Sequence, residues 1–200
     1  MLVDIEDVLF WMDAIRNSKD RYRTLESFWK GQVRSKVWLI EHLTNYANLE
    51  PNEIVIHGGW NGVLSSLLFN SNIKIKKITS LDIDPECETV ALTVNKNQEI
   101  QGKFLAITDN MCKHNYHADI VINTSCEHIS DIELTQWFNN IPNNALIVMQ
   151  SNNYFELDEH INCVNSIDEL VKKVNFSSYT GYELIMPKYT RYMIIGRKNV

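Results

Sequence analysis

Glycine is scarce in this chain, and the few glycines are unevenly placed. The 200 residues include 7 glycines and 4 prolines, which excludes collagen-like and low-complexity chains. Gly31 is the one glycine before Gly58, and Gly59 and Gly62 then follow within the next four positions. Such a cluster predicts a point where the backbone needs unusual dihedral angles or must come close to another group.

Paired cysteines, long apolar runs and excess positive charge are also missing. The 4 cysteines form no CxxC pair and no signal-peptide pattern precedes them, which favours reduced thiols in a cytoplasmic protein. No apolar run reaches the roughly 18 residues of a membrane span. The net charge of −6 argues against a surface that coats nucleic acid. We therefore expect a soluble cytoplasmic protein, and its oligomeric state is not indicated.

Residues 1–50 have the pattern of helices. Apolar residues recur at three- and four-residue steps from Leu2 to Ile15, which is typical of one helix face. A second helix is expected to begin with Ser35 as its cap and to end before Pro51, because a proline restricts the residue before it. We predict that residues 1–50 form a helical extension and that residues 51–200 form the main domain.

From Glu53 onward, short β-branched runs alternate with helical segments. Runs of this kind predict strands buried on both faces of a parallel sheet. The segments on either side of Pro187 are joined too closely for a crossover, so we expect them to be antiparallel. The predicted strands are 53–58, 75–84, 103–109, 118–123 and 144–151, and the predicted helices are 62–70, 85–97, 130–141 and 166–174.

A ligand is expected where the first of these strands turns into a helix. Ligands of open α/β sheets bind outside the carboxyl ends of the strands. The segment "HGGWNG" stands at such an end, and Asp82 ends the next strand about twenty residues later, where a carboxylate can accept both ribose hydroxyls. The G-x-G-x-x-G spacing of nicotinamide dinucleotide sites is missing, which disfavours an oxidoreductase.

Taken in order, these segments resemble a class I S-adenosylmethionine-dependent methyltransferase. "VIHGGWNG" matches the glycine-rich turn of that family, "LDIDPECETVA" its second-strand segment, and "ITDN" its third-strand segment. "ADIVINTSCEH" is similar to its fourth strand and substrate-facing loop. The resemblance covers about residues 50–198. It implies a Rossmann-like α/β fold with a mostly parallel seven-stranded sheet and a C-terminal antiparallel hairpin, and S-adenosyl-L-methionine as the cofactor.

The resemblance also implies a set of cofactor-binding residues. Asp82 would hold the ribose, Ile83 would lie against the adenine ring, and Asp109 would meet the adenine amino group. The whole set implied in this way is His57, Gly58, Gly59, Trp60, Gly62, Asp82, Ile83, Asp109, Asn110 and Asn123.

Two positions depart from the family pattern. The family usually has an acid two residues before its first glycine, where this chain has Ile56, and Trp60 replaces the middle glycine. The missing acid removes a usual anchor for the amino-acid end of the cofactor, and Gln32, Ser35 and Lys36 are the upstream candidates for that task. These departures leave two alternatives open. One is a non-catalytic, methyltransferase-like binding or assembly module, and the other is transfer of the aminocarboxypropyl arm.

The segment "NTSCEH", which starts at Asn123, is the richest polar cluster of the chain. Methyl transfer requires an aligned acceptor and, where that acceptor carries a proton, a base. Glu127 and His128 are the predicted catalytic residues, since a histidine titrates near neutrality. An alternative makes Cys126 a nucleophile beside His128.

We expect no metal, because a site of His114, His117 and His128 has no second pair of ligands in the sequence to support it.

The acceptor is expected to be a small polar molecule. Asn152 and Tyr154 in "QSNNYF" follow a predicted strand, and Arg191 suits a substrate carboxylate or phosphate. These three are the predicted substrate-binding residues. Methylation of DNA or RNA is disfavoured, because "NTSC" lacks the prolines and the aromatic ring of nucleic-acid amino-methyltransferases and the chain is acidic.

Overall fold

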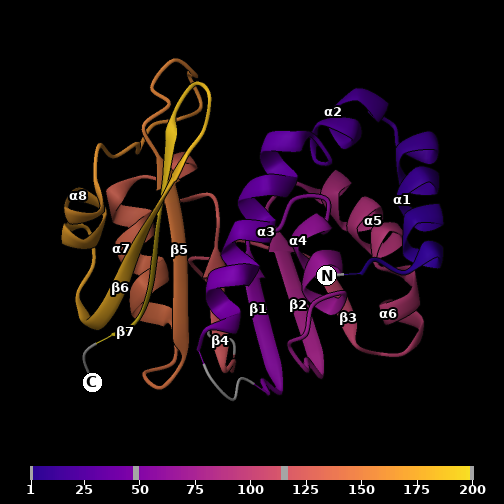
Figure 1. The fold of residues 1–200 in the computed structure, drawn as a ribbon, viewed down its shortest axis with the longest axis horizontal. Helices are drawn as coiled ribbons and strands as arrows, with labels where there is room; N and C mark the ends of the chain where they lie inside the picture. The colour runs from indigo at the N-terminus through magenta and orange to yellow at the C-terminus, as the bar shows by residue number, and fades with distance from the viewer. Residues whose placement is uncertain (1, 47–49, 114–116, 199–200) are drawn as a thin grey trace. The chain divides into compact units, whose positions relative to one another are not determined.

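The structure is a computed structural model that describes residues 2–46, 50–113 and 117–198. The chain divides into two compact units, Met1–Asn110 and Met111–Val200. Figure 1 draws the first unit from indigo to magenta and the second from rose to yellow. The boundary between these compact units lies after Asn110, whereas the predicted domain boundary lies after residue 50. The predicted domain boundary stays a prediction.

The N-terminal segment is helical, as its periodicity predicts. It consists of α1 (Ile5–Asn17), α2 (Arg21–Glu26) and α3 (Lys30–Thr44). Within the first unit, α1 packs against α5 (Pro85–Val94), and α3 packs against α4 (Val63–Phe69). The predicted start of the second helix at Ser35 is wrong, because Ser35 lies inside α3 and donates its hydroxyl to the Gln32 carbonyl at 3.0 Å.

Three parallel strands form the sheet of the first unit. β2 (Lys77–Asp82) pairs with β1 (Glu53–His57) on one side and with β3 (Phe104–Thr108) on the other. The residues from Ile54 to Ile56 are fully buried, which explains the continuous apolar run in this strand. After α5, the short helix α6 (Lys96–Ile100) leads into β3.

The second unit contains a parallel pair of strands and an antiparallel hairpin. β4 (Ile120–Asn123) is parallel to β5 (Leu146–Asn152), which pairs antiparallel with β7 (Thr190–Lys198). β7 also pairs antiparallel with β6 (Phe176–Ile185) across a tight turn. The connections contain the short helix η1 (Cys126–His128), α7 (Asp131–Asn140) and α8 (Ile167–Lys172).

The seven strands and their directions confirm the predicted fold class, a mixed α/β fold with a mostly parallel sheet and a C-terminal antiparallel hairpin. Ser130 and Glu133 form a capping box at the start of α7, which agrees with the predicted start of that helix at residue 130. Among the described residues, we find no helix with the length and apolar character needed to cross a membrane.

Candidate functional site

The glycine cluster forms a tight turn between β1 and α4. Gly58 has a φ of 62° and Gly62 a φ of 71°, in the left-handed region that favours glycine. Trp60 has a φ of 47° and is the one non-glycine residue with positive φ in the described part of the chain. A side chain in this region costs about 1–2 kcal/mol, and such strain often marks a functional position.

Packing within the unit explains two of these glycines. A Cβ atom on Gly59 would lie 2.0 Å from the Ser80 Oγ, on β2. A Cβ atom on Gly62 would lie 3.0 Å from the Ala91 Cβ and 2.6 Å from the Asn95 Nδ2. Both positions therefore need glycine because the turn lies directly on β2 and α5, whether or not a ligand binds there.

Asp82 ends β2 with its carboxylate directed at this turn. Its Oδ2 accepts a hydrogen bond from the Trp60 N–H at 2.8 Å, and its Oδ1 accepts one from the Asp84 N–H at 3.1 Å. Each carboxylate oxygen has a second lone pair, and Asp82 is only half-buried. The side chain can therefore accept one further hydrogen bond at each oxygen, which is what a ribose diol would donate.

Other predicted cofactor residues surround Asp82. The Asp109 N–H donates to the Asp82 carbonyl at 2.9 Å, and the Asn110 N–H donates to the Asp109 carboxylate at 2.7 Å. Ile83 is 72% exposed and offers an apolar surface beside Asp82. His57 is buried at the end of β1. The first unit thus brings together every predicted cofactor residue except Asn123.

The hollow beside the turn is small. It holds about 160 Å³ of empty space, open solvent included. Trp60, the residue with positive φ in the turn, is one of the residues that line it. The full lining is Trp60, Ser80, Asp82, Cys87, Glu88, Ala91, Ala106 and Ile107.

Sequence reasoning did not identify Arg23, which lies at the same edge. Its Nη1 forms an ion pair with the Asp84 Oδ2 at 2.5 Å, and Asp84 caps α5 by accepting the Glu86 N–H at 2.9 Å. The pKa of Asp84 is lowered, first by this backbone hydrogen bond and then by Arg23. Burial raises the pKa of the neighbouring Cys87 thiol to about 12.

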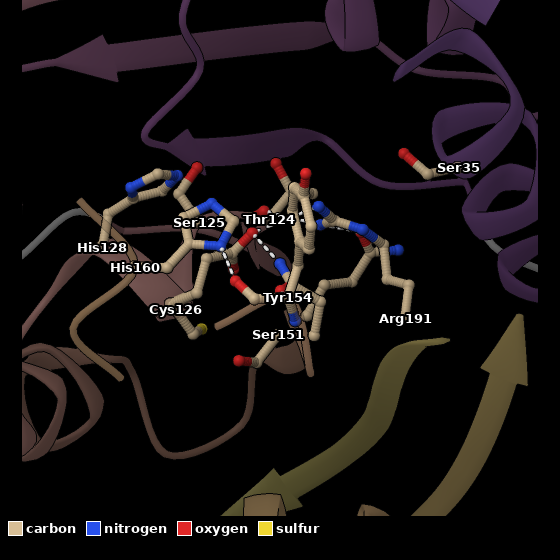
Figure 2. A network of polar contacts seen from close by, with 12 residues as sticks. Ser35, Thr124, Ser125, Cys126, His128, Ser151, Tyr154, His160 and Arg191 are labelled. Carbon is tan, nitrogen blue, oxygen red and sulfur yellow. Dashed lines mark hydrogen bonds and ion pairs between the residues drawn. The ribbon is translucent and has the colours of Figure 1, made fainter. Parts of the chain in front are cut away.

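In the second unit, three of the predicted catalytic and substrate residues, Glu127, Asn152 and Arg191, form a buried polar cluster. The Glu127 Oε1 accepts hydrogen bonds from the Asn152 Nδ2 at 2.7 Å and from the Arg191 Nη2 at 3.1 Å. The Arg191 Nη1 donates to the Thr124 carbonyl at 3.1 Å and to the Gln150 Oε1 at 3.3 Å. Figure 2 shows this cluster from close by.

Both charges of the cluster are withdrawn from solvent. Glu127 is 1% exposed and Arg191 is 6% exposed. Burial by itself lowers the pKa of Arg191, but its interactions with Glu127 and Tyr189 outweigh burial and raise this pKa, so the guanidinium stays charged. A buried carboxylate needs such a partner, because an isolated buried charge is strongly destabilising.

His128 lies at the outer side of this cluster, beside His160. The two imidazole rings meet edge to face with their centroids 4.7 Å apart, as Figure 2 shows. His128 is exposed and His160 is half-buried. Sequence reasoning did not identify His160, although the tripeptide Glu-His-Ile occurs at residues 127–129 and again at 159–161.

Tyr154 connects the histidine pair to the hairpin. Its ring stacks on Tyr189 at 5.5 Å and meets His160 edge to face at 6.0 Å. Its N–H donates to the Asn152 Oδ1 at 2.8 Å. Asn152 therefore accepts a hydrogen bond at its Oδ1 and donates one to Glu127 from its Nδ2. Gln150 and Thr124 are further members of the cluster; both lie in segments singled out in the sequence, but neither was predicted as a site residue.

Asn123 is fully buried at the end of β4. Its Oδ1 accepts the Ser125 N–H at 2.8 Å, which shapes the turn that leads to Glu127.

Cys126 is buried beside Asn123, and burial raises the pKa of its thiol well above the ordinary value. Because the thiolate is the nucleophile, this environment disfavours the Cys126–His128 alternative. His114, a member of the disfavoured metal set, lies outside the described residues.

Several solved structures with this fold are methyltransferases. The magnesium protoporphyrin IX methyltransferase of Synechocystis PCC 6803, solved with bound SAM, has a TM-score of 0.68 and 13% sequence identity, with 96% of this chain and 91% of that one covered. The fold is that of the class I methyltransferases. The resemblance predicted from the sequence is thereby confirmed for the fold.

Two further matches extend this comparison. The mitomycin 7-O-methyltransferase MmcR has a TM-score of 0.65 at 13% identity, with 94% of this chain and 60% of that one covered. The small RNA methyltransferase HEN1 has a TM-score of 0.66 at 14% identity, with 87% of this chain and 26% of that one covered. No protein-family model and no curated protein matches the sequence.

Proposed function

We propose that this protein is an S-adenosylmethionine-dependent methyltransferase that acts on a small polar acceptor. The observation that carries the proposal is the position of the Asp82 carboxylate at the end of β2, against the positive-φ turn and with a free lone pair on each oxygen. The fold adds support, since structures with this fold were solved with bound SAM or SAH.

The first unit would hold the nucleoside part of the cofactor. Asp82 would accept the two ribose hydroxyls, exposed Ile83 would cover one face of the adenine, and Asp109 would accept the adenine amino group. When bound, the cofactor supplies an electrophilic methyl group on a sulfonium ion. Gly58 and Trp60 would line the path of the ligand, because they form the backbone of the turn.

The amino-acid end of the cofactor requires other partners. Ile56, which stands where the family has an acid, is fully buried and offers no polar group. Gln32 and Lys36 lie one helical turn apart on α3, and the Lys36 Nζ donates to the Gln32 Oε1 at 2.9 Å. An amide and an ammonium together can bind a carboxylate, so they remain our candidates, with Ser35 beside them.

On the acceptor side, His128 is the better base of the two predicted residues. Glu127 already accepts two hydrogen bonds at its Oε1 and pairs with a buried arginine. His128 is exposed, so its imidazole can reach a substrate and exchange a proton with solvent. Glu127, Asn152 and Arg191 would then position the loop that carries His128, and Tyr154 would contact the acceptor.

Calorimetric titration with S-adenosylhomocysteine tests the cofactor proposal. Asp82→Asn keeps an oxygen for the Trp60 N–H but removes the charge, so we expect roughly 10- to 100-fold weaker binding from the loss of charge-assisted hydrogen bonds. Asp158→Asn, an exposed change in the second unit, should bind like the unchanged protein.

The alternatives give different results in the same assay. Absence of heat with the unchanged protein would contradict the proposal and favour a non-catalytic module. Where the cofactor does turn over, the product separates the two transfer reactions. Methyl transfer releases S-adenosylhomocysteine, whereas aminocarboxypropyl transfer releases 5′-methylthioadenosine.

A further inference from the structure

Glu127, His128 and His160 place three potential metal-ligand atoms within 4.8 Å of one another. All three residues belong to the second unit. Glu127 and His128 come from η1, and His160 comes from the segment that follows β5. Residues distant in the sequence therefore converge on one point, which the histidine spacing alone did not indicate.

The hydrogen bonds of the two histidines leave one nitrogen of each ring available. The His128 Nδ1 lies 3.2 Å from the Glu159 carbonyl, and the His160 Nδ1 lies 2.8 Å from the Tyr154 carbonyl. A carbonyl only accepts hydrogen bonds, so each Nδ1 carries the proton and each Nε2 has a free lone pair. Metal-binding histidines have the same arrangement, with the other nitrogen donating to a carbonyl or carboxylate.

The second oxygen of Glu127 is an independent indication. Glu127 is 1% exposed, and its Oε1 is used by Asn152 and Arg191, whereas its Oε2 is buried without a hydrogen-bond partner among the described residues. A buried carboxylate oxygen without a partner is costly. A cation beside it would remove this cost, and the Oε1 contacts would hold the ligand in place.

We propose that Glu127, His128 and His160 bind a divalent transition-metal ion, with zinc as the reference ion. Two imidazole nitrogens and one carboxylate oxygen form a donor set that suits zinc, iron or manganese, whereas magnesium and calcium prefer oxygen ligands alone. Three protein ligands leave a further coordination position open to water or to a substrate atom. The metal site does not depend on the methyltransferase proposal, but it gives the His128 Nε2 to the ion, so a His128 that holds the metal cannot also be the base proposed above.

Small side-chain rotations would complete the site. Zinc lies about 2.0–2.2 Å from its nitrogen and oxygen ligands, so two ligand atoms of one ion are at most about 4.4 Å apart. This distance is slightly shorter than the 4.8 Å within which the three ligand atoms lie in the structure. His128 is exposed and His160 half-buried, so both rings can turn toward the buried carboxylate. The sequence-based expectation of no metal concerned a different set of histidines.

Metal content and zinc titration test this site. The whole chain is stripped with a chelator, and zinc binding is followed by calorimetry and, after gel filtration, by mass spectrometry of the metal. We expect about one zinc per chain, and His160→Ala should weaken binding at least roughly 10- to 100-fold, by analogy with the loss of a metal-site partner. His117→Ala, an exposed histidine of the same unit, should leave binding unchanged.

Cobalt provides a second measurement that a structural defect would not reproduce. Substitution by Co²⁺ should produce visible absorption bands in the unchanged protein and in His117→Ala, but not in His160→Ala or His128→Ala. Far-ultraviolet circular dichroism checks that each variant is folded. Zinc binding that survives in His160→Ala, or a stripped protein that binds magnesium as tightly as zinc, would overturn the proposal.

Discussion

The two units hold their polar groups in opposite ways. At the glycine turn of the first unit, backbone N–H groups contact one half-buried carboxylate, Asp82, which keeps free lone pairs. In the second unit, Glu127 and Arg191 are almost completely buried, and the Glu127 Oε1 serves two donors. The first arrangement leaves hydrogen-bond acceptors available to a ligand. In the second arrangement, the ion pair of Glu127 and Arg191 fixes the segment that contains η1.

This difference determines what a substitution should do. A half-buried carboxylate that loses a partner is still hydrated, so its loss affects ligand binding more than folding. A buried ion that loses its partner cannot be hydrated and destabilises the whole unit.

The largest expected effect is that of Arg191→Met, which leaves Glu127 buried without its counter-ion. We expect a loss of about 3–5 kcal/mol in the free energy of unfolding, measured by urea denaturation. Asp82→Asn should lose only about 1 kcal/mol in the same measurement, since it breaks one hydrogen-bonded contact at a half-exposed site.

Two controls sharpen this experiment. Arg34→Met changes an exposed arginine and should stay within about 0.5 kcal/mol of the unchanged protein. The double variant Arg191→Met/Glu127→Gln should recover part of the loss, because no unpaired charge is then left buried. Equal destabilisation by Arg191→Met and Asp82→Asn would show that the two units do not differ in this way.

An intermediate effect is expected for Gly59→Ala in the first unit. The new methyl group would lie 2.0 Å from the Ser80 Oγ, so we expect a loss of about 1–3 kcal/mol, the usual cost of overpacking. The thermal unfolding midpoint should fall accordingly. The double variant Gly59→Ala/Ser80→Ala removes the clashing oxygen and should recover most of the lost stability. If stability is not recovered, the destabilisation comes from the backbone of the turn and not from the clash with Ser80.

The smallest effect is that of Asp84→Asn, which keeps a capping oxygen for α5 but removes the charge that pairs with Arg23. The pKa of Asp84 is lowered in the folded protein. Its charge therefore stabilises the fold above the unfolded-state pKa of about 3.9, and this contribution is lost as the pH falls through the lowered value.

We expect the variant to be less stable by under about 1 kcal/mol at pH 7, since the ion pair is partly exposed. The difference should shrink as the pH is lowered below about 4 in chemical denaturation measurements. A difference that grows in acid would contradict the assignment of the charge to this pair.

The arrangement of the glycine turn and Asp82 at the edge of the first unit could be predicted from the sequence because that edge is built from local features. A strand, a glycine turn and an acid at the end of the next strand are each visible as short patterns, and parallel pairing aligns them at their carboxyl ends. Arg23 was not predicted because its partner, Asp84, is distant in the sequence and precedes another helix, α5. The position of Trp60 in the lining of the hollow depends on the folded conformation of the turn.

The cluster of the second unit was only partly visible in the sequence. Glu127, His128, Asn152, Tyr154 and Arg191 were all named as site residues, but as separate candidates for different tasks. No pattern indicated that Arg191 on β7 neutralises Glu127 in η1, or that His160 lies beside His128.

The amino-acid sequence by itself determined the order of the strands and of the main helices from Glu53 onward, the glycine turn and the acid beside it. These follow from hydrophobic periodicity and backbone geometry, which act between residues close together in the chain. Tertiary structure alone decided which charges are paired and which buried atoms have no hydrogen-bond partner among the described residues, such as the Glu127 Oε2. The reason is physical: burial and hydrogen bonding depend on neighbours from distant segments, here η1, β5, β7 and the loop that carries His160.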